Sequence, residues 1–294
     1  MKKEPVIKST LSYGNLKLHH IRNNRFKFNQ DRIVRVLLPE DYDPNGEKYE
    51  VIYMLDGQNL FDRKTAQYHM EWCMDEIVKD KMQTEGIRPR IIVGLDCGDD
   101  RIPEYLPLIV SNEELQKQKC KESYVKRQEN FKEDFDLFKA KGDITFDYLI
   151  NDVIPFVEEN YNVRTDREGR TFGGSSMGGL MAVYAYEHYY EIFKNYIAFS
   201  IAFPILKYIT GKDEIFKDFC SKFEVHKENR IAICVGGKEF EADFTPYYNE
   251  FTKLLRELGL DDTNLFTVFD PKAFHNEYQW CKAMQLAYVW FFKK

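Results

Sequence analysis

The chain has 294 residues, and its hydrophobic content of 44% is typical of a globular protein rather than a disordered one. Its formal net charge of −6 argues against a general nucleic-acid binder, because such proteins neutralise phosphates with an excess of lysine and arginine. The sequence has no apolar run of about 18 residues and no apolar stretch after the two N-terminal lysines, so we expect neither a membrane span nor a signal peptide.

Strand-like and helix-like segments alternate along the chain, which predicts an α/β fold with a mostly parallel sheet. Extended stretches at 16–21 and 32–38 indicate an antiparallel hairpin at one sheet edge. Further strands are expected at 51–55, 90–96, 170–174, 196–199, 230–235 and 265–269, and helices at 68–83, 146–160, 178–190, 214–222, 246–258 and 277–294. With about eight strands, helices on both faces and no linker, residues 1–294 are predicted to form one domain.

A charged segment at about 111–141 interrupts this alternation and is too long for an ordinary connection. It is expected to be a solvated helical excursion, and a lid over the site is the alternative interpretation.

The six cysteines are scattered and form no CxxC pair or cluster with histidine, which favours buried free thiols (Cys73, Cys97, Cys120, Cys220, Cys234 and Cys281). Together with the missing export signal, this predicts a cytoplasmic protein. No cofactor or metal site is predicted.

The stretch RTFGGSSMGG contains a G-x-S-x-G pentapeptide, residues 174–178, between a predicted strand and a predicted helix. A serine in such a sharp turn is lifted clear of the sheet, and the helix that follows offers free N–H groups to a developing oxyanion. The pattern therefore predicts an α/β-hydrolase with Ser176 as nucleophile. Ser175 is the rival hydroxyl, but it lacks glycine on both sides at the required spacing.

A serine nucleophile needs a histidine base and an orienting carboxylate, which follow it in the order acid, then histidine. His275 lies between the last strand and the last helix and is favoured over His188 and His226. Glu239, just beyond the strand at 230–235, is the predicted acid. Its neighbours Glu241, Asp243 and Asp270 remain alternatives.

The second oxyanion donor is expected in the loop that follows the strand at 51–55. The backbone N–H of Gln58 and that of Met177 are the predicted pair, with Gly57 allowing a tight turn. Asp56 is interpreted as a buried residue that caps this turn.

Six segments in order over roughly 230 residues resemble the esterase family of α/β-hydrolases that includes enterochelin esterases, feruloyl and acetyl-xylan esterases, esterase D and mycolyltransferases. They are 53–62, 91–105, 149–163, 173–182, 235–239 and 274–280. The resemblance implies Ser176, Glu239 and His275 as catalytic residues, with Gln58 and Met177 at the oxyanion positions. The acid is often aspartate in that family, and the 111–141 excursion is longer than usual there.

These features predict a serine esterase that acts on a small-molecule ester without a cofactor, a metal, nucleic acid or a membrane. A siderophore ester and an acylated sugar are the candidate substrates, and Arg101 is a candidate contact for an acidic siderophore. An acyltransferase with the same triad and a non-catalytic binding protein are the alternatives. A homo-oligomer is compatible with the sequence.

Overall fold

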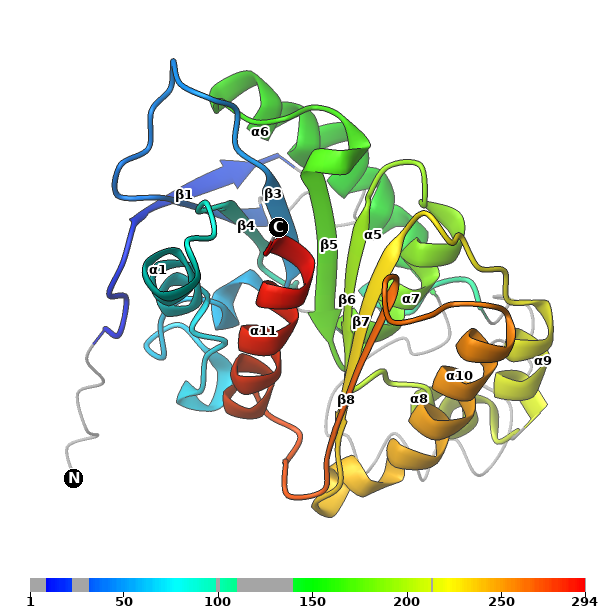
Figure 1. Ribbon diagram of the computed structural model, residues 1–294. Coiled ribbons are helices and arrows are strands. Elements are labelled where there is room, and N and C mark those ends of the chain that lie inside the picture. The colour runs from blue at the N-terminus through cyan, green and yellow to red at the C-terminus, as the bar shows by residue number, and fades with distance from the viewer. Residues whose placement is uncertain (1–8, 23–31, 99–100, 110–139, 213, 294) are drawn as a thin grey trace, which may run out of the picture.

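The computed structural model describes residues 9–22, 32–98, 101–109, 140–212 and 214–293 (Figure 1). Eight strands form one sheet in the order β1-β2-β4-β3-β5-β6-β7-β8. Their bounds are β1 Asn15–Ile21, β2 Arg32–Leu38, β3 Val51–Leu55, β4 Ile91–Leu95, β5 Arg170–Ser175, β6 Asn195–Phe199, β7 Arg230–Gly236 and β8 Leu265–Asp270. The expected α/β-hydrolase architecture is confirmed.

The antiparallel edge predicted from the first forty residues is also present. Strand β1 pairs antiparallel with β2, and β2 pairs antiparallel with β4, whereas all pairs from β4 to β8 are parallel. The carboxyl ends of the parallel strands therefore share one edge of the sheet, where ligands bind in open α/β sheets.

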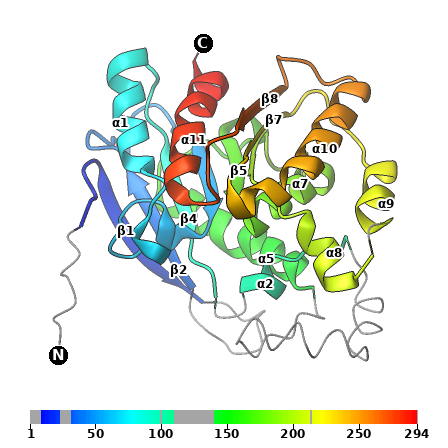
Figure 2. The same ribbon diagram turned by 90° about the horizontal axis from the view of Figure 1, so that it is seen from below.

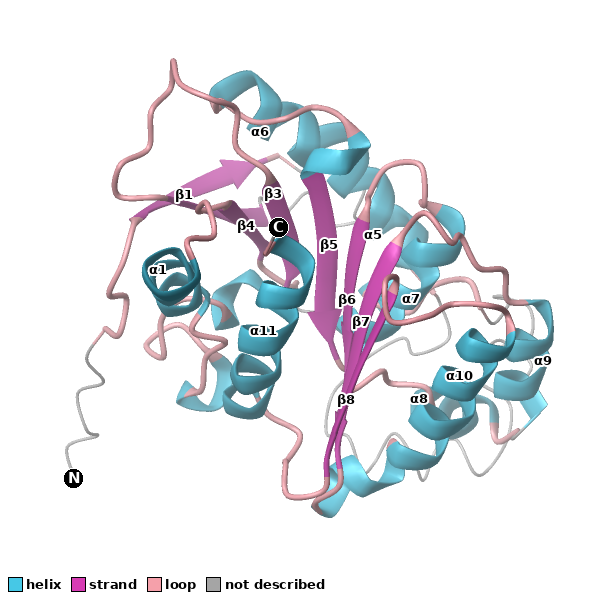
Figure 3. Cartoon of the chain, in the orientation of Figure 1, coloured by secondary structure: helices cyan, strands magenta, loops and turns pink. Residues whose placement is uncertain are grey.

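Helices cover both faces of the sheet (Figures 1, 2 and 3). Strand β3 illustrates why: Val51, Tyr53 and Leu55 enter one buried core, and the alternating Ile52 and Met54 enter the other. The second core is closed by α1 (Met74–Glu85) and α11 (Glu277–Phe292). The first contains residues of α5 (Gly142–Tyr148), α6 (Ile154–Asn160), α7 (Met177–His188), α8 (Pro204–Thr210), α9 (Glu214–Lys222) and α10 (Thr245–Glu257). A short helix, α2 (Arg101–Glu104), follows β4.

The helix expected at 68–83 begins six residues later than predicted, at Met74. Tyr68, His69 and Cys73 have positive φ angles of 58°, 55° and 52°, which a right-handed helix does not allow. The helix expected at 146–160 is longer, because α5 and α6 are joined through a π-helical turn at Leu149–Val153. The charged helical excursion expected at about 111–141, with a lid as its alternative interpretation, lies almost entirely outside the described residues.

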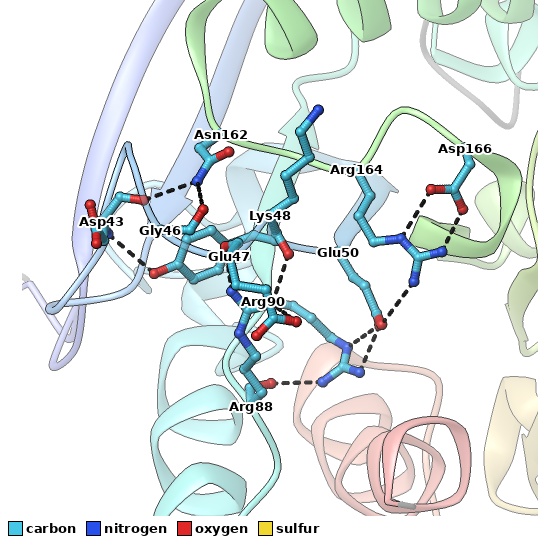
Figure 4. A network of polar contacts seen from close by, with 11 residues as sticks. Asp43, Gly46, Glu47, Lys48, Glu50, Arg88, Arg90, Asn162, Arg164 and Asp166 are labelled. Carbon is cyan, nitrogen blue, oxygen red and sulfur yellow. Dashed lines mark hydrogen bonds and ion pairs between the residues drawn. The ribbon is translucent and has the colours of Figure 1, made fainter.

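A polar network joins the loops at the opposite end of the parallel strands (Figure 4). Arg90 contacts Glu50 through two guanidinium nitrogens at 3.0 and 2.7 Å, and Arg88 donates to the carbonyl oxygens of Glu47 and Lys48. Arg164 lies between Glu50 and its own bidentate partner, Asp166. A cavity of about 270 Å³ borders this network. The charged groups of the network pair with one another, so we assign the network a structural role.

Candidate active site

Ser176 occupies a sharp turn between β5 and α7. Its φ and ψ angles are 57° and −118°, which is a strained conformation for a residue with a side chain. Its N–H donates to the Phe199 carbonyl over 2.9 Å, which fixes the turn to the end of β6. The neighbouring strand thus stabilises a backbone conformation that would otherwise be unfavourable.

The glycines around Ser176 are needed for different reasons than the pentapeptide suggests. A Cβ atom on Gly174 would lie 3.0 Å from the Gly178 Cα atom, so Gly174 has little room for a side chain. A Cβ on Gly178 would meet Leu55 at 3.6 Å and Asp56 Oδ2 at 3.9 Å, which are ordinary contact distances. A Cβ on Gly179 would lie 2.5 Å from the Phe199 carbonyl oxygen. The close contacts therefore require glycine at 174 and 179, whereas position 178 has room for a Cβ atom.

Ser176 and His275 line the same cavity, which has a volume of about 680 Å³. It opens at the carboxyl ends of the parallel strands, where β3, β4 and β5 lead into loops. Its other lining residues come from the loops after β3 and β4, from α2, from the end of β5 and from the start of α11: Asp56, Gln58, Asn59, Thr65, Gln67, Tyr68, Met70, Asp96, Cys97, Gly98, Arg101, Ile102, Ser175, Asn276, Glu277 and Trp280.

The carboxylate that contacts His275 is Glu241, not Glu239. Glu241 is fully buried, and its Oε2 forms a short contact with His275 Nδ1. Glu239 is exposed and begins a 3-10 turn (Glu239–Asp243) with a φ of 50°. This turn directs the residue two positions later towards the interior, so the prediction that Glu239 partners His275 is wrong. Asp243 is also exposed, and Asp270 accepts from the N–H of Lys272 in its own turn.

The surroundings of Glu241 favour its ionised form. Its Oε1 accepts from the Gly236 N–H at 2.8 Å and from the Ser200 hydroxyl. Burial alone raises the pKa of the Glu241 carboxyl, but the contact with His275 and these two hydrogen bonds together lower it below its ordinary value. A carboxylate in this state accepts the Nδ1–H of a neighbouring imidazole.

Among the hydrogen bonds of the described residues, none joins the Ser176 hydroxyl to His275. Catalytic hydrogen bonds are often long in the absence of substrate and shorten in the Michaelis complex. The shared cavity thus brings the two side chains to one site without an existing proton-transfer contact.

The loop after β3 turns at Asp56, whose φ of 56° and ψ of 48° are left-handed. Gly57 has a different role from the one predicted, because a Cβ there would lie 2.6 Å from the carbonyl carbon of Gly94 in β4. The Gln58 side chain anchors the loop to Cys97, accepting its N–H at 3.2 Å and donating to its sulfur at 3.2 Å. In the described parts of the chain, the N–H groups of Gln58 and Met177 donate to no backbone acceptor in turns, loops or caps.

A match to the family model "Putative esterase" extends over residues 26–247, which is most of the chain. The chain belongs to this family. It is a carboxylic ester hydrolase, in agreement with the resemblance stated above.

Several individual proteins are similar to this esterase over nearly its whole length. The uncharacterized protein YbbA of Bacillus subtilis (strain 168) is 21% identical over 290 residues, covering 96% of this chain and 97% of its own. Among solved structures, an IroE-like serine hydrolase from Shewanella oneidensis matches with a TM-score of 0.66 and 18% identity over 94% of this chain and 79% of its own. The siderophore hydrolase EstB from Aspergillus nidulans matches with a TM-score of 0.65 and 16% identity, over 99% and 98% of the two chains. At these identities the solved structures establish the shared fold.

Arg101 in this esterase is not a free cation in the cavity. Its guanidinium forms two hydrogen bonds with the buried carboxylate of Asp56. Asp96, also in the lining, is held in the same way by Arg35. Asp56 therefore starts the loop and pairs with Arg101, rather than only capping a turn, and the expected role of Arg101 as an anion contact is not supported.

Three further lining or supporting residues of this esterase were not singled out from the sequence. Glu277, two residues after His275, accepts from the Asn59 side chain at 2.9 Å and links the loop after β3 to the start of α11. Ser200 donates to Glu241, and Trp280 donates to Ser200. The only available signals were an acidic residue and a tryptophan shortly after the histidine, Glu277 and Trp280, and sequence alone reveals neither their burial nor their partners.

The other two histidines considered lie outside the cavity lining. His226 stacks on Tyr190 with ring centroids 3.6 Å apart, and His188 is half exposed beside Glu187. The described residues contain no group of three histidine, cysteine or acidic side chains that could hold a metal ion. None of the described helices is both long and apolar enough to cross a membrane.

Proposed function

We propose that this esterase cleaves its substrate through an acyl-enzyme on Ser176, with His275 as general base and Glu241 as the orienting acid. The observation that carries the proposal is the shared cavity, which is lined both by a strained serine at a strand-to-helix turn and by a histidine tied to a buried carboxylate. These are the three side chains that nucleophilic catalysis by serine requires.

In the first step, Ser176 Oγ attacks the ester carbonyl carbon while His275 Nε2 takes the hydroxyl proton. The electron pair of the broken C=O π bond becomes an oxyanion, which the N–H groups of Gln58 and Met177 stabilise. Both groups lack an acceptor among the turn, loop and cap hydrogen bonds of the described residues, and Met177 begins α7, whose positive dipole end favours negative charge. Collapse of the oxyanion breaks the bond to the alcohol, which leaves with the proton from His275.

In the second step, water attacks the acyl-enzyme while His275 accepts one of its protons. The acyl–Ser176 bond breaks, Ser176 regains its proton from His275, and the carboxylic acid leaves. Glu241 accepts the Nδ1–H throughout and stabilises the imidazolium that forms in each step.

The test is covalent labelling with a fluorophosphonate probe, followed by peptide mapping. We expect the label on Ser176, its loss in Ser176→Ala, and a fall in p-nitrophenyl acetate turnover on the order of 10⁴-fold in that variant. Ser175→Ala is the matched control, because Ser175 is the adjacent buried hydroxyl in the same cavity lining. Labelling that persists in Ser176→Ala would disprove the assignment.

The same acyl-enzyme could transfer its acyl group to an alcohol instead of water. Product analysis with added alcohols or sugars separates the two outcomes. Arg101, which lines the cavity, is paired with Asp56, and the lining carboxylate of Asp96 is paired with Arg35. We therefore expect neutral acetyl and feruloyl esters to be cleaved in preference to strongly anionic ones. A screen of acetyl, feruloyl, thioester and siderophore esters measures this preference.

We also propose a cytoplasmic location. Its support is that the five cysteines in the described regions are free thiols, as is usual in a reducing compartment. Fractionation of the producing cells tests it.

A further inference from the structure

The Glu241 carboxylate is held from the side opposite His275 by residues that no catalytic pattern includes. Ser200 follows β6 directly, is buried, and has a φ of 45°. Its N–H donates to the Cys234 carbonyl over 2.7 Å, which fixes its backbone to β7. This strained and anchored position directs the Ser200 side chain towards Glu241 Oε1.

The direction of the hydrogen bonds in this group follows from the chemistry of the side chains. The Trp280 indole N–H can only donate, and it lies 2.8 Å from Ser200 Oγ. The Ser200 oxygen therefore accepts from Trp280, and its single proton points to Glu241. Glu241 Oε1 accepts from both Ser200 and the Gly236 N–H.

Two donors on Oε1 stabilise the carboxylate over the carboxylic acid. The proton in the contact between Glu241 Oε2 and His275 Nδ1 then belongs to the imidazole. With Nδ1 protonated, Nε2 of the neutral ring is the acceptor, and this is the tautomer that a base for Ser176 requires.

Trp280 also packs directly against the imidazole. The two rings meet edge to face, with centroids 5.0 Å apart and an interplanar angle of 84°. Trp280 is itself held by Trp72, at 5.8 Å between centroids. One residue in the first turn of α11 thus restrains both the ring of His275 and the hydroxyl that orients its carboxylate.

We propose that Ser200 and Trp280 are positioning residues that keep Glu241 ionised and His275 in the Nδ1–H tautomer. This inference rests on the proposed function of Ser176 and His275. It adds a chain of hydrogen-bond donors, from Trp280 through Ser200 to Glu241, that orients the carboxylate of the proposed triad.

The experiment compares Ser200→Ala and Trp280→Phe with the wild-type esterase. Ser200→Ala removes one donor from Glu241, so we expect kcat to fall about tenfold with KM nearly unchanged. Trp280→Phe leaves the Ser200 hydroxyl free to donate, so we expect a smaller fall, about threefold. A Glu241 carboxylate with fewer donors takes up a proton more readily and also attracts the imidazolium more strongly. Both effects move the acidic limb of kcat/KM to higher pH.

A second measurement reads the tautomer without turnover. Nitrogen-15 spectra of histidine-labelled protein distinguish Nδ1–H from Nε2–H, and we expect the His275 signals to shift towards a mixture in Ser200→Ala. The control is Thr210→Val, which removes a buried hydroxyl that donates to the Leu206 carbonyl in α8. Thr210→Val should lower thermal stability about as much as Ser200→Ala does. It should leave kcat, the pH profile and the His275 tautomer unchanged.

A Ser200→Ala variant with wild-type kcat, pH profile and tautomer would overturn the proposal. So would a fall in kcat with an unmoved pH limb and tautomer, because that result describes a merely structural residue. Failure of the fluorophosphonate probe to label the wild-type protein would instead reject the proposed function, and the spectra would still report on the hydrogen-bond chain.

Discussion

Asp56 and Arg101 form a two-point ion pair at the wall of the cavity, with 2.7 Å between Oδ1 and Nε and 2.6 Å between Oδ2 and Nη2. The pair joins the end of β3 to α2. Since Asp56 directly precedes Gly57 and Gln58, the ion pair also fixes the start of the loop proposed to bind the oxyanion.

The first prediction concerns this pair. Arg101→Met leaves the buried Asp56 carboxylate without its partner, so we expect a loss of about 3 kcal/mol in the free energy of unfolding, measured with urea. The double variant Asp56→Asn with Arg101→Met should recover most of it. The control is Arg256→Met, at an exposed pair with Asp262, which should cost less than about 1 kcal/mol. Equal losses at both sites would contradict the prediction.

The second prediction separates the two glutamates of the 3-10 turn. Glu241→Gln keeps the shape of the side chain but offers the wrong group to His275, so kcat should fall on the order of 10⁴-fold. Glu239→Gln changes an exposed side chain and should retain activity within about twofold. Steady-state kinetics on folded protein check both, and a large loss in Glu239→Gln alone would restore the acid predicted from sequence.

The third prediction is a pH dependence of stability. Burial raises the pKa of the Glu277 carboxyl from 4.5 to about 7, with the charge of Asp56 adding to the effect. An acid with a raised pKa stabilises the folded state below pH 4.5, and this contribution is lost as the pH rises towards 7. We therefore expect wild-type stability to fall over this window by up to about 2 kcal/mol more than that of Glu277→Gln.

Thermal unfolding of the two proteins in matched buffers measures that difference. Other buried acids contribute equally to both curves, so only the gap between them concerns Glu277. Parallel curves from pH 4 to pH 8 would show that its ionisation is not coupled to folding.

The fourth prediction tests the close approach of Gly57 to β4. Gly57→Ala places a methyl group 2.6 Å from the Gly94 backbone, so we expect a loss of about 1 to 3 kcal/mol and a clear fall in kcat as the loop moves. Gly86→Ala is the control, because its Cβ would meet nothing within 4 Å and only its φ of 64° is unfavourable. It should cost about 1 kcal/mol and leave kcat unchanged. Unaltered kinetics in Gly57→Ala would show that the loop tolerates displacement.

Local pattern was enough to predict much of this esterase. The apolar segments predicted where the strands lie along the chain, because burial on both faces of a strand leaves a continuous apolar run. The serine between a strand and a helix, and the histidine after the last strand, were predicted because each is defined by its position next to an element. The start of α1 was missed, since the left-handed residues before Met74 carry no glycine to mark them.

Sequence by itself determined the fold, the family and the two segments that carry Ser176 and His275. Only the tertiary structure decided which carboxylate serves His275. Glu239 and Glu241 lie in the same turn and are chemically alike, and what separates them is burial together with contacts from distant residues. Gly236, Ser200 and His275 converge on Glu241 from three different parts of the chain. A short-range pattern contains no information about such a convergence, because it arises when β6, β7 and the loop before α11 are packed together.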